Sequence, residues 1–116
     1  MRKQTGDINW KDKQVAQLAQ SFVSLETSKE AEAFLRDLLT PEEIMEFSRR
    51  LETAVLLSKN VQYNAIIEKT GLSSTTIARI SKWLRGPLGG YRNILNKMTL
   101  NKMHHHNQPK LGRGLS

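Results

Sequence analysis

The apolar residues of this chain recur at three- and four-residue steps, in stretches separated by short polar breaks. This spacing is the helical period, because it places apolar side chains on one face of each helix. It predicts six helices, over approximately residues 12–25, 28–39, 41–59, 63–70, 73–85 and 91–100. Residues 1–11 and 101–116 lack this pattern, and we expect a flexible N-terminus and a disordered basic tail there.

Capping signals support two of these helix starts. Thr27 is followed three residues later by Glu30, the form of a capping box. Thr40 repeats the signal with Pro41 at the first helical position and Glu43 near the positive end of the helix dipole. The helix that follows Thr40 has apolar residues covering more than one stripe: Ile44, Phe47, Leu51, Ala54, Val55 and Leu57. A helix buried on two sides suits a central position or one shared with a second subunit.

The stretch from Tyr63 to Arg85 predicts a helix-turn-helix. Tyr63–Thr70 is too short to be stable alone, so it must pack against the helix after it. Gly71 permits the left-handed backbone that ends the first helix, and Ser73 or Ser74 can cap the second. The apolar seam expected between the two helices consists of Ile66, Leu72, Ile77, Ile80 and Leu84.

The opposite face of the second helix is small and hydroxylic at its start and cationic further along. This is the character of a recognition helix in a DNA major groove, where small groups allow entry and cations meet phosphates. The predicted DNA-binding residues are Tyr63, Asn64, Ser73, Ser74, Thr75, Thr76, Ala78, Arg79 and Lys82. The alternative is an ordinary pair of helices whose outer face is merely solvated.

Charge distribution favours the first interpretation. The net charge is +7, but residues 1–58 hold 8 basic and 10 acidic side chains, a net of −2. Residues 59–116 hold 10 basic residues and one acidic residue, Glu68, a net of +9. A field of one sign concentrated on the half with the helix pair is typical of proteins that bind a polyanion. The bland explanation is a basic tail plus chance, yet the tail beyond Leu100 supplies only 3 of these 10 residues.

No motif for catalysis or a cofactor is found in the sequence. The chain has no cysteine, which excludes disulfides and thiolate metal sites and fits a reducing cytoplasm. The run His104–His106 cannot direct three ligands to one tetrahedral metal, so we expect no metal site. No apolar run is long enough for a membrane span, and no signal peptide is evident. We therefore expect a cytoplasmic protein that is not an enzyme and uses no cofactor.

Four motifs together resemble the tryptophan-repressor superfamily, and most closely its small YerC/YecD group. They are Leu38-Leu39-Thr40-Pro41-Glu42-Glu43, Arg49-Arg50-Leu51-Glu52, Thr76-Ile77-Ala78-Arg79 and Gly89-Gly90-Tyr91-Arg92. The resemblance covers roughly residues 12–100, which it identifies as one DNA-binding domain. It implies an all-α fold of six helices, an entwined homodimer, and transcriptional control through a two-fold operator.

The family's tryptophan pocket carries over only in part. Arg50 and Arg79 match the arginines that stack on the two sides of the ligand's ring. Ile80 stands where the family has a small Gly, and Trp83 replaces a polar contact to the ligand's amino end. We therefore expect a remnant pocket that Ile80 and Trp83 fill permanently, without tryptophan as corepressor.

The sequence predicts a homodimeric regulator that binds double-stranded DNA at a near-palindromic site and acts as a repressor. The rival hypothesis is an interaction protein whose basic helix docks an acidic protein or RNA.

Overall fold

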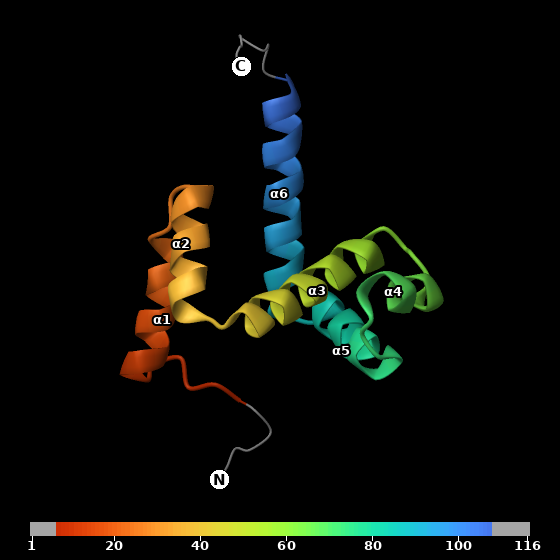
Figure 1. The fold of residues 1–116 in the computed structure, drawn as a ribbon, viewed down its shortest axis with the longest axis horizontal. Coiled ribbons are helices and arrows are strands. Elements are labelled where there is room, and N and C mark those ends of the chain that lie inside the picture. The colour runs from red at the N-terminus through yellow and green to blue at the C-terminus, as the bar shows by residue number, and fades with distance from the viewer. Residues whose placement is uncertain (1–6, 108–116) are drawn as a thin grey trace. The chain divides into compact units, whose positions relative to one another are not determined.

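A computed structural model describes residues 7–107 of the chain, with side chains described for residues 7–101. The described residues form six helices and no strand, so the all-α prediction is confirmed (Figure 1). The helices are α1 (Lys13–Val23), α2 (Ser28–Leu38), α3 (Pro41–Ser58), α4 (Tyr63–Thr70), α5 (Ser74–Arg85) and α6 (Gly90–Asn107). None of the helices in the described part is long and apolar enough to cross a membrane.

The chain divides into two compact units, with the boundary inside α3 between Ile44 and Met45. In the first unit, α1 and α2 run side by side, and the rings of Phe22 and Phe34 meet edge to face at 5.8 Å (Figure 1). No side chain of α1 or α2 is buried, and Phe22 remains 48% exposed. A two-helix unit of this size has too few elements to enclose a core of its own.

Local capping determines where the helices of the first unit begin. Asp12 accepts hydrogen bonds from the N–H groups of Gln14 and Val15 and so starts α1. Thr27 caps the N–H of Glu30 at 3.1 Å, as predicted. The Glu30 carboxylate accepts from the N–H of Glu26, one residue earlier than a standard capping box would place it.

The box at the start of α3 is complete. Thr40 Oγ1 accepts from the N–H of Glu43 at 3.1 Å, and the Glu43 carboxylate accepts from the N–H of Thr40 at 2.9 Å. At the other end of α3, Asn60 adopts a left-handed conformation with φ of 63°. The N–H of Val61 donates back to the carbonyl of Leu56, which closes the helix.

The core of the second unit lies where α3, α4 and α5 meet. Leu56, Ile66 and Ile77 form its centre, surrounded by the partly buried Leu57, Val61, Ile67 and Leu72. Ile66, Ile77 and Ile80 are fully buried, so the predicted seam between the paired helices is confirmed. Complete burial of one isoleucine side chain contributes roughly 1.5–3 kcal/mol. The expected apolar stripe of α3 omitted Leu56 and included Phe47, which is 46% exposed.

The last helix is longer than the pattern predicted. The sequence placed its end near Leu100, with a disordered tail from residue 101, whereas α6 continues to Asn107. Few apolar residues follow Leu100, but neither Gly nor Pro interrupts the chain between Tyr91 and Asn107, so the backbone hydrogen bonds can continue. Residues 1–6 and 108–116, which belong to the predicted flexible segments, lie outside the described residues. Asn9 precedes α1 in a turn, in which its carbonyl accepts from the N–H of Asp12.

Candidate nucleic-acid interface

The turn between α4 and α5 has the conformation that the sequence predicted. Gly71 adopts φ of 77° and donates its N–H to the carbonyl of Ile67 at 2.8 Å. The buried hydroxyl of Thr70 donates to the Ile66 carbonyl and accepts from the N–H of Leu72. These bonds satisfy backbone groups that a helix end leaves free, and they stabilise the turn between α4 and α5.

Ser73, rather than Ser74, caps the second helix. Its hydroxyl accepts from the N–H of Thr76 at 3.2 Å and donates to the Thr76 hydroxyl at 3.1 Å. Ser73 and Thr76 are therefore engaged with each other, whereas Ser74 and Thr75 stand exposed at the start of α5.

The predicted DNA-binding residues lie almost entirely on the surface. Eight of the nine are exposed, and Thr76 is half-buried. Ser74, Thr75, Ala78, Arg79 and Lys82 follow one another at steps that keep them on one face of α5. The buried Ile77, Ile80 and Ser81 occupy the opposite face. The helix thus presents a continuous polar strip outward while its apolar side holds it to the core.

The cations of this strip have no acidic partner in the part of the chain that the structure describes. One salt bridge is formed there, between Arg50 and Glu46 on α3. Arg79 and Lys82 are exposed and take no part in it. Their charges are therefore available to an external anion. Arg85, at the end of α5, instead donates to the hydroxyl of Ser81.

The first helix of the pair begins without a side-chain cap. The residue before it, Gln62, makes no side-chain capping bond to α4. Tyr63 and Asn64 are the first two residues of α4, and both are exposed. The unsatisfied N–H groups and positive dipole of such a helix end attract negatively charged groups.

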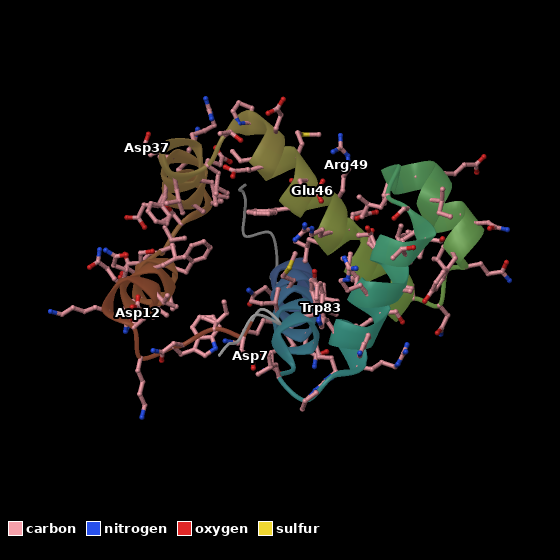
Figure 2. The ribbon with its side chains drawn as sticks, turned by 90° about the horizontal axis from the view of Figure 1, so that it is seen from below. Asp7, Asp12, Asp37, Glu46, Arg49 and Trp83 are labelled. Carbon is pink, nitrogen blue, oxygen red and sulfur yellow. The ribbon has the colours of Figure 1, made fainter. Side chains whose placement is uncertain are left out.

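Of the four residues of the predicted remnant pocket, Trp83 lines the apolar cavity described next, and the other three do not line that cavity. Ile80 is fully buried. Arg50 donates to Glu46 at 3.2 Å and stacks over the ring of Phe47, 5.6 Å from its centre. Arg79 is exposed on the outer strip. Figure 2 shows Glu46 on α3 and Trp83 on α5.

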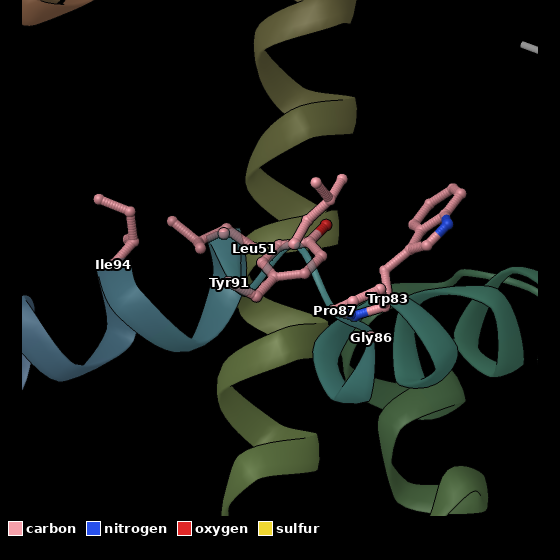
Figure 3. A pocket seen from close by; sticks show the side chains of 8 residues that line it. Leu51, Trp83, Gly86, Pro87, Tyr91 and Ile94 are labelled. Atoms are coloured by element: carbon pink, nitrogen blue, oxygen red, sulfur yellow. The ribbon is translucent and has the colours of Figure 1, made fainter. Parts of the chain in front are cut away.

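Trp83 borders an apolar cavity rather than filling one. The cavity has a volume of about 580 Å³ and lies among the end of α5, the start of α6 and the middle of α3. Its lining residues are Leu51, Trp83, Gly86, Pro87, Leu88, Gly90, Tyr91 and Ile94. Leu51 on α3 and Tyr91 on α6 both line this cavity, and in Figure 3 the indole of Trp83 extends away from them. Trp83 is 50% exposed.

The hydroxyl of Tyr91, which lines this cavity, is partly shielded from water. Burial raises the pKa of the Tyr91 hydroxyl above its usual value of 10.0, and the nearby positive charge of Arg50 opposes that rise. Desolvation disfavours the charged phenolate, whereas a cation favours it. The direction of the net shift means that loss of water around the hydroxyl outweighs the effect of Arg50.

The sequence interpretation gave no structural role to Arg92. Its Nη1 atom donates to the carbonyls of Leu84 and Gly86, each at 2.8 Å. The sequence does contain a signal for this role: Arg92 is a cation in the first turn of a helix, where the helix dipole favours an acidic residue. No group of three or more potential metal ligands occurs among the described residues, and the side chains of His104–His106 lie outside them.

Six helices, a glycine-closed helix pair and an exposed basic second helix define a protein of the helix-turn-helix class. A sequence model of the family described as Trp repressor protein matches residues 13–99. The uncharacterized protein YerC of Bacillus subtilis (strain 168) is 34% identical over 86 residues, which cover 74% of this chain and 83% of that protein. The chain therefore belongs to the Trp repressor family.

A solved structure supports the same assignment at the level of the fold. The crystal structure of a TrpR like protein from Eubacterium eligens ATCC 27750 is similar with a TM-score of 0.72 and 36% sequence identity. The similarity covers 78% of this chain and 93% of that one. Proteins of this family are regulators rather than enzymes.

Proposed function

We propose that this protein is a sequence-specific DNA-binding transcriptional regulator. The observation that carries the proposal is the exposed strip of α5, with its hydroxyls at the capped end and its unpaired cations further along. Ser74, Thr75 and Ala78 enter the major groove and meet base edges. Arg79 and Lys82 bind the flanking phosphates, and a guanine edge is a second partner for Arg79.

The start of α4 supplies an additional phosphate contact. Its N–H groups have no side-chain cap, so they are free to donate to a phosphate oxygen. Tyr63 and Asn64 lie beside them and add side-chain donors. A contact of this kind orients the protein on the duplex without reading its sequence.

The active form is a homodimer. The helices of the first unit bury no side chain, and large apolar residues on α6 are also half exposed, including Ile94 at 48% and Met98 at 49%. A second copy covers such surface, in keeping with the entwined dimer that the family resemblance implies. Two recognition helices then lie about one DNA turn apart, ~34 Å, and the operator is near-palindromic. The cytoplasm is where such a protein meets DNA.

DNA binding is independent of tryptophan. Ile80, which stands where the family resemblance places a small Gly, is fully buried. Arg50 is already engaged by Glu46 and by the ring of Phe47. Both observations support a recognition helix that binds DNA without an effector. The family to which the chain belongs favours repression as the effect of this protein on transcription.

The test is enrichment of random DNA duplexes by the purified protein at near-physiological salt, with and without tryptophan. We expect the same near-palindromic motif in both conditions. A motif that needs tryptophan would refute effector independence. The absence of any motif would refute sequence-specific DNA binding and favour an acidic protein or RNA as the partner of the basic helix.

A further inference from the structure

The break between α5 and α6 brings opposite helix ends together. The last carbonyls of α5 form its negative end, and the Gly86 N–H already bonds to the Trp83 carbonyl. Arg92 Nη1 has two hydrogens, and it donates to the carbonyls of Leu84 and Gly86, both at 2.8 Å. One guanidinium thus joins the start of α6 to the end of α5 across the intervening loop.

Arg92 is poorly placed for the stability of α6 alone. It lies in the first turn of that helix, which contains no acidic residue, and a cation near this positive end is unfavourable. Its charge is favourable only for α5, whose negative end it neutralises. The position of Arg92 is therefore explained by the contact between the two helices.

Gly89 provides the space that this contact needs. It is buried, with φ of +73°, and a Cβ atom added there would lie 3.0 Å from Arg92 Nη2. A side chain at position 89 would both strain the backbone and displace the Arg92 guanidinium. The absence of a side chain at position 89 thus leaves room for the Arg92 guanidinium.

We infer that Arg92 is a positioning residue for DNA binding, which sets the direction of α5 relative to α6; the inference rests on the proposed function. The buried Ile77 and Ile80 hold the middle of α5, so a displacement of its last turn would tilt the helix about them. Movement of its last turn is then transmitted to its first turn, which carries Ser74 and Thr75. In a dimer joined partly through α6, the Arg92 contact determines the distance between the two recognition helices, which are the α5 helices of the two subunits.

The test compares Arg92→Met, which removes the donors, with Arg92→Lys, which retains a charge and N–H groups. Lys97→Met is the matched control, because Lys97 is an exposed cation on the same helix. Each variant is titrated with the selected operator and with operators whose half-sites are one base pair closer or farther apart. Circular dichroism at the assay temperature establishes that each variant is folded.

We expect Arg92→Met, which removes both hydrogen bonds, to reduce the preference for the native spacing by about fivefold, no more than the loss of two typical hydrogen bonds can supply. Arg92→Lys restores part of the preference, and Lys97→Met retains all of it. The salt dependence of operator binding stays unchanged in Arg92→Met, since no phosphate contact is lost. An unchanged spacing preference in Arg92→Met would overturn the inference. A slope of log affinity against log salt that is smaller in magnitude by about 0.9 would also overturn it, because it would indicate a lost phosphate contact.

A second measurement does not depend on DNA. Trp83 lies on the last turn of α5, so its fluorescence anisotropy reports the mobility of that helix end once Trp10 is replaced by Phe. Arg92→Met should lower the anisotropy, and no change would overturn the inference. If the unmodified protein selects no operator, the DNA-binding role falls with the proposed function, while lowered anisotropy would still support the contact between α5 and α6.

Discussion

Two glycines of this chain offer a comparison in which only the backbone conformation differs. A Cβ added at Gly71 or at Gly90 would meet no atom within 4 Å, so neither substitution to alanine causes a clash. Gly71 has φ of 77°, whereas Gly90 is the first residue of α6 and does not have a positive φ. The same chemical change should therefore alter stability in opposite directions.

The expected magnitudes follow from the backbone. A left-handed conformation costs a residue with a Cβ roughly 1–2 kcal/mol. Alanine also lowers the conformational entropy of the unfolded chain relative to glycine, which stabilises the folded state by about 0.4–1 kcal/mol. Gly71→Ala should thus lower the free energy of unfolding by about 1 kcal/mol per subunit. Gly90→Ala introduces no such strain and should raise the free energy of unfolding by roughly 0.5–1 kcal/mol.

The assay is equilibrium unfolding in urea, followed by circular dichroism at one fixed protein concentration, because the stability of a dimer depends on concentration. Gly71→Asn serves as a control, since asparagine tolerates the left-handed conformation and should cost less than alanine. Equal shifts of the midpoint for Gly71→Ala and Gly90→Ala would refute the argument. So would a Gly71→Ala protein at least as stable as the original.

Three further outcomes test the interface and its surroundings. Arg79→Ala should lower the slope of log affinity against log salt by about 0.9 on all sequences, whereas Lys97→Ala, outside the proposed interface, should leave it unchanged. Ser73→Ala should destabilise the protein by about 1 kcal/mol and Ser73→Gly by only a few tenths, as measured by urea unfolding; equal losses would argue against a capping role. The raised pKa of Tyr91 stabilises the protein fully below pH 10 and less as pH rises from there through the folded-state pKa, because the unfolded chain loses its phenolic proton first. Unfolding at pH 8 and above pH 10 should therefore show a smaller decline for Tyr91→Phe than for the unmodified protein, with Tyr63→Phe as the control.

The helix starts illustrate what can be predicted from local sequence. Thr40 and Glu43 lie three residues apart, and that spacing alone brings each side chain to the other's N–H once a helix forms. Gly71 marks a left-handed turn for a similar reason, since its conformation is a property of one residue. Even here a detail depended on the surroundings: Glu30 bonds to Glu26 rather than to Thr27.

Burial was predicted correctly where two neighbouring helices pack on each other. Ile66 and Ile77 are close along the chain and face each other across a short turn, so periodicity sufficed to identify them. Leu56 was missed because its burial depends on how α3 crosses the helix pair, which no local period encodes. Phe47 belongs to the predicted apolar stripe of α3, and in the described structure its ring is half exposed beneath Arg50.

The sequence by itself determined the helices, the glycine turn, the buried seam and the concentration of positive charge, because each depends on residues near one another in the chain or on composition. Only the tertiary structure decided which partners the long side chains choose. Arg50 pairs with Glu46, Trp83 borders a cavity with Leu51 and Tyr91, and Arg92 reaches back to the end of α5. A flexible cationic side chain can reach many groups, and the packing of the helices determines which of them lies within a hydrogen bond.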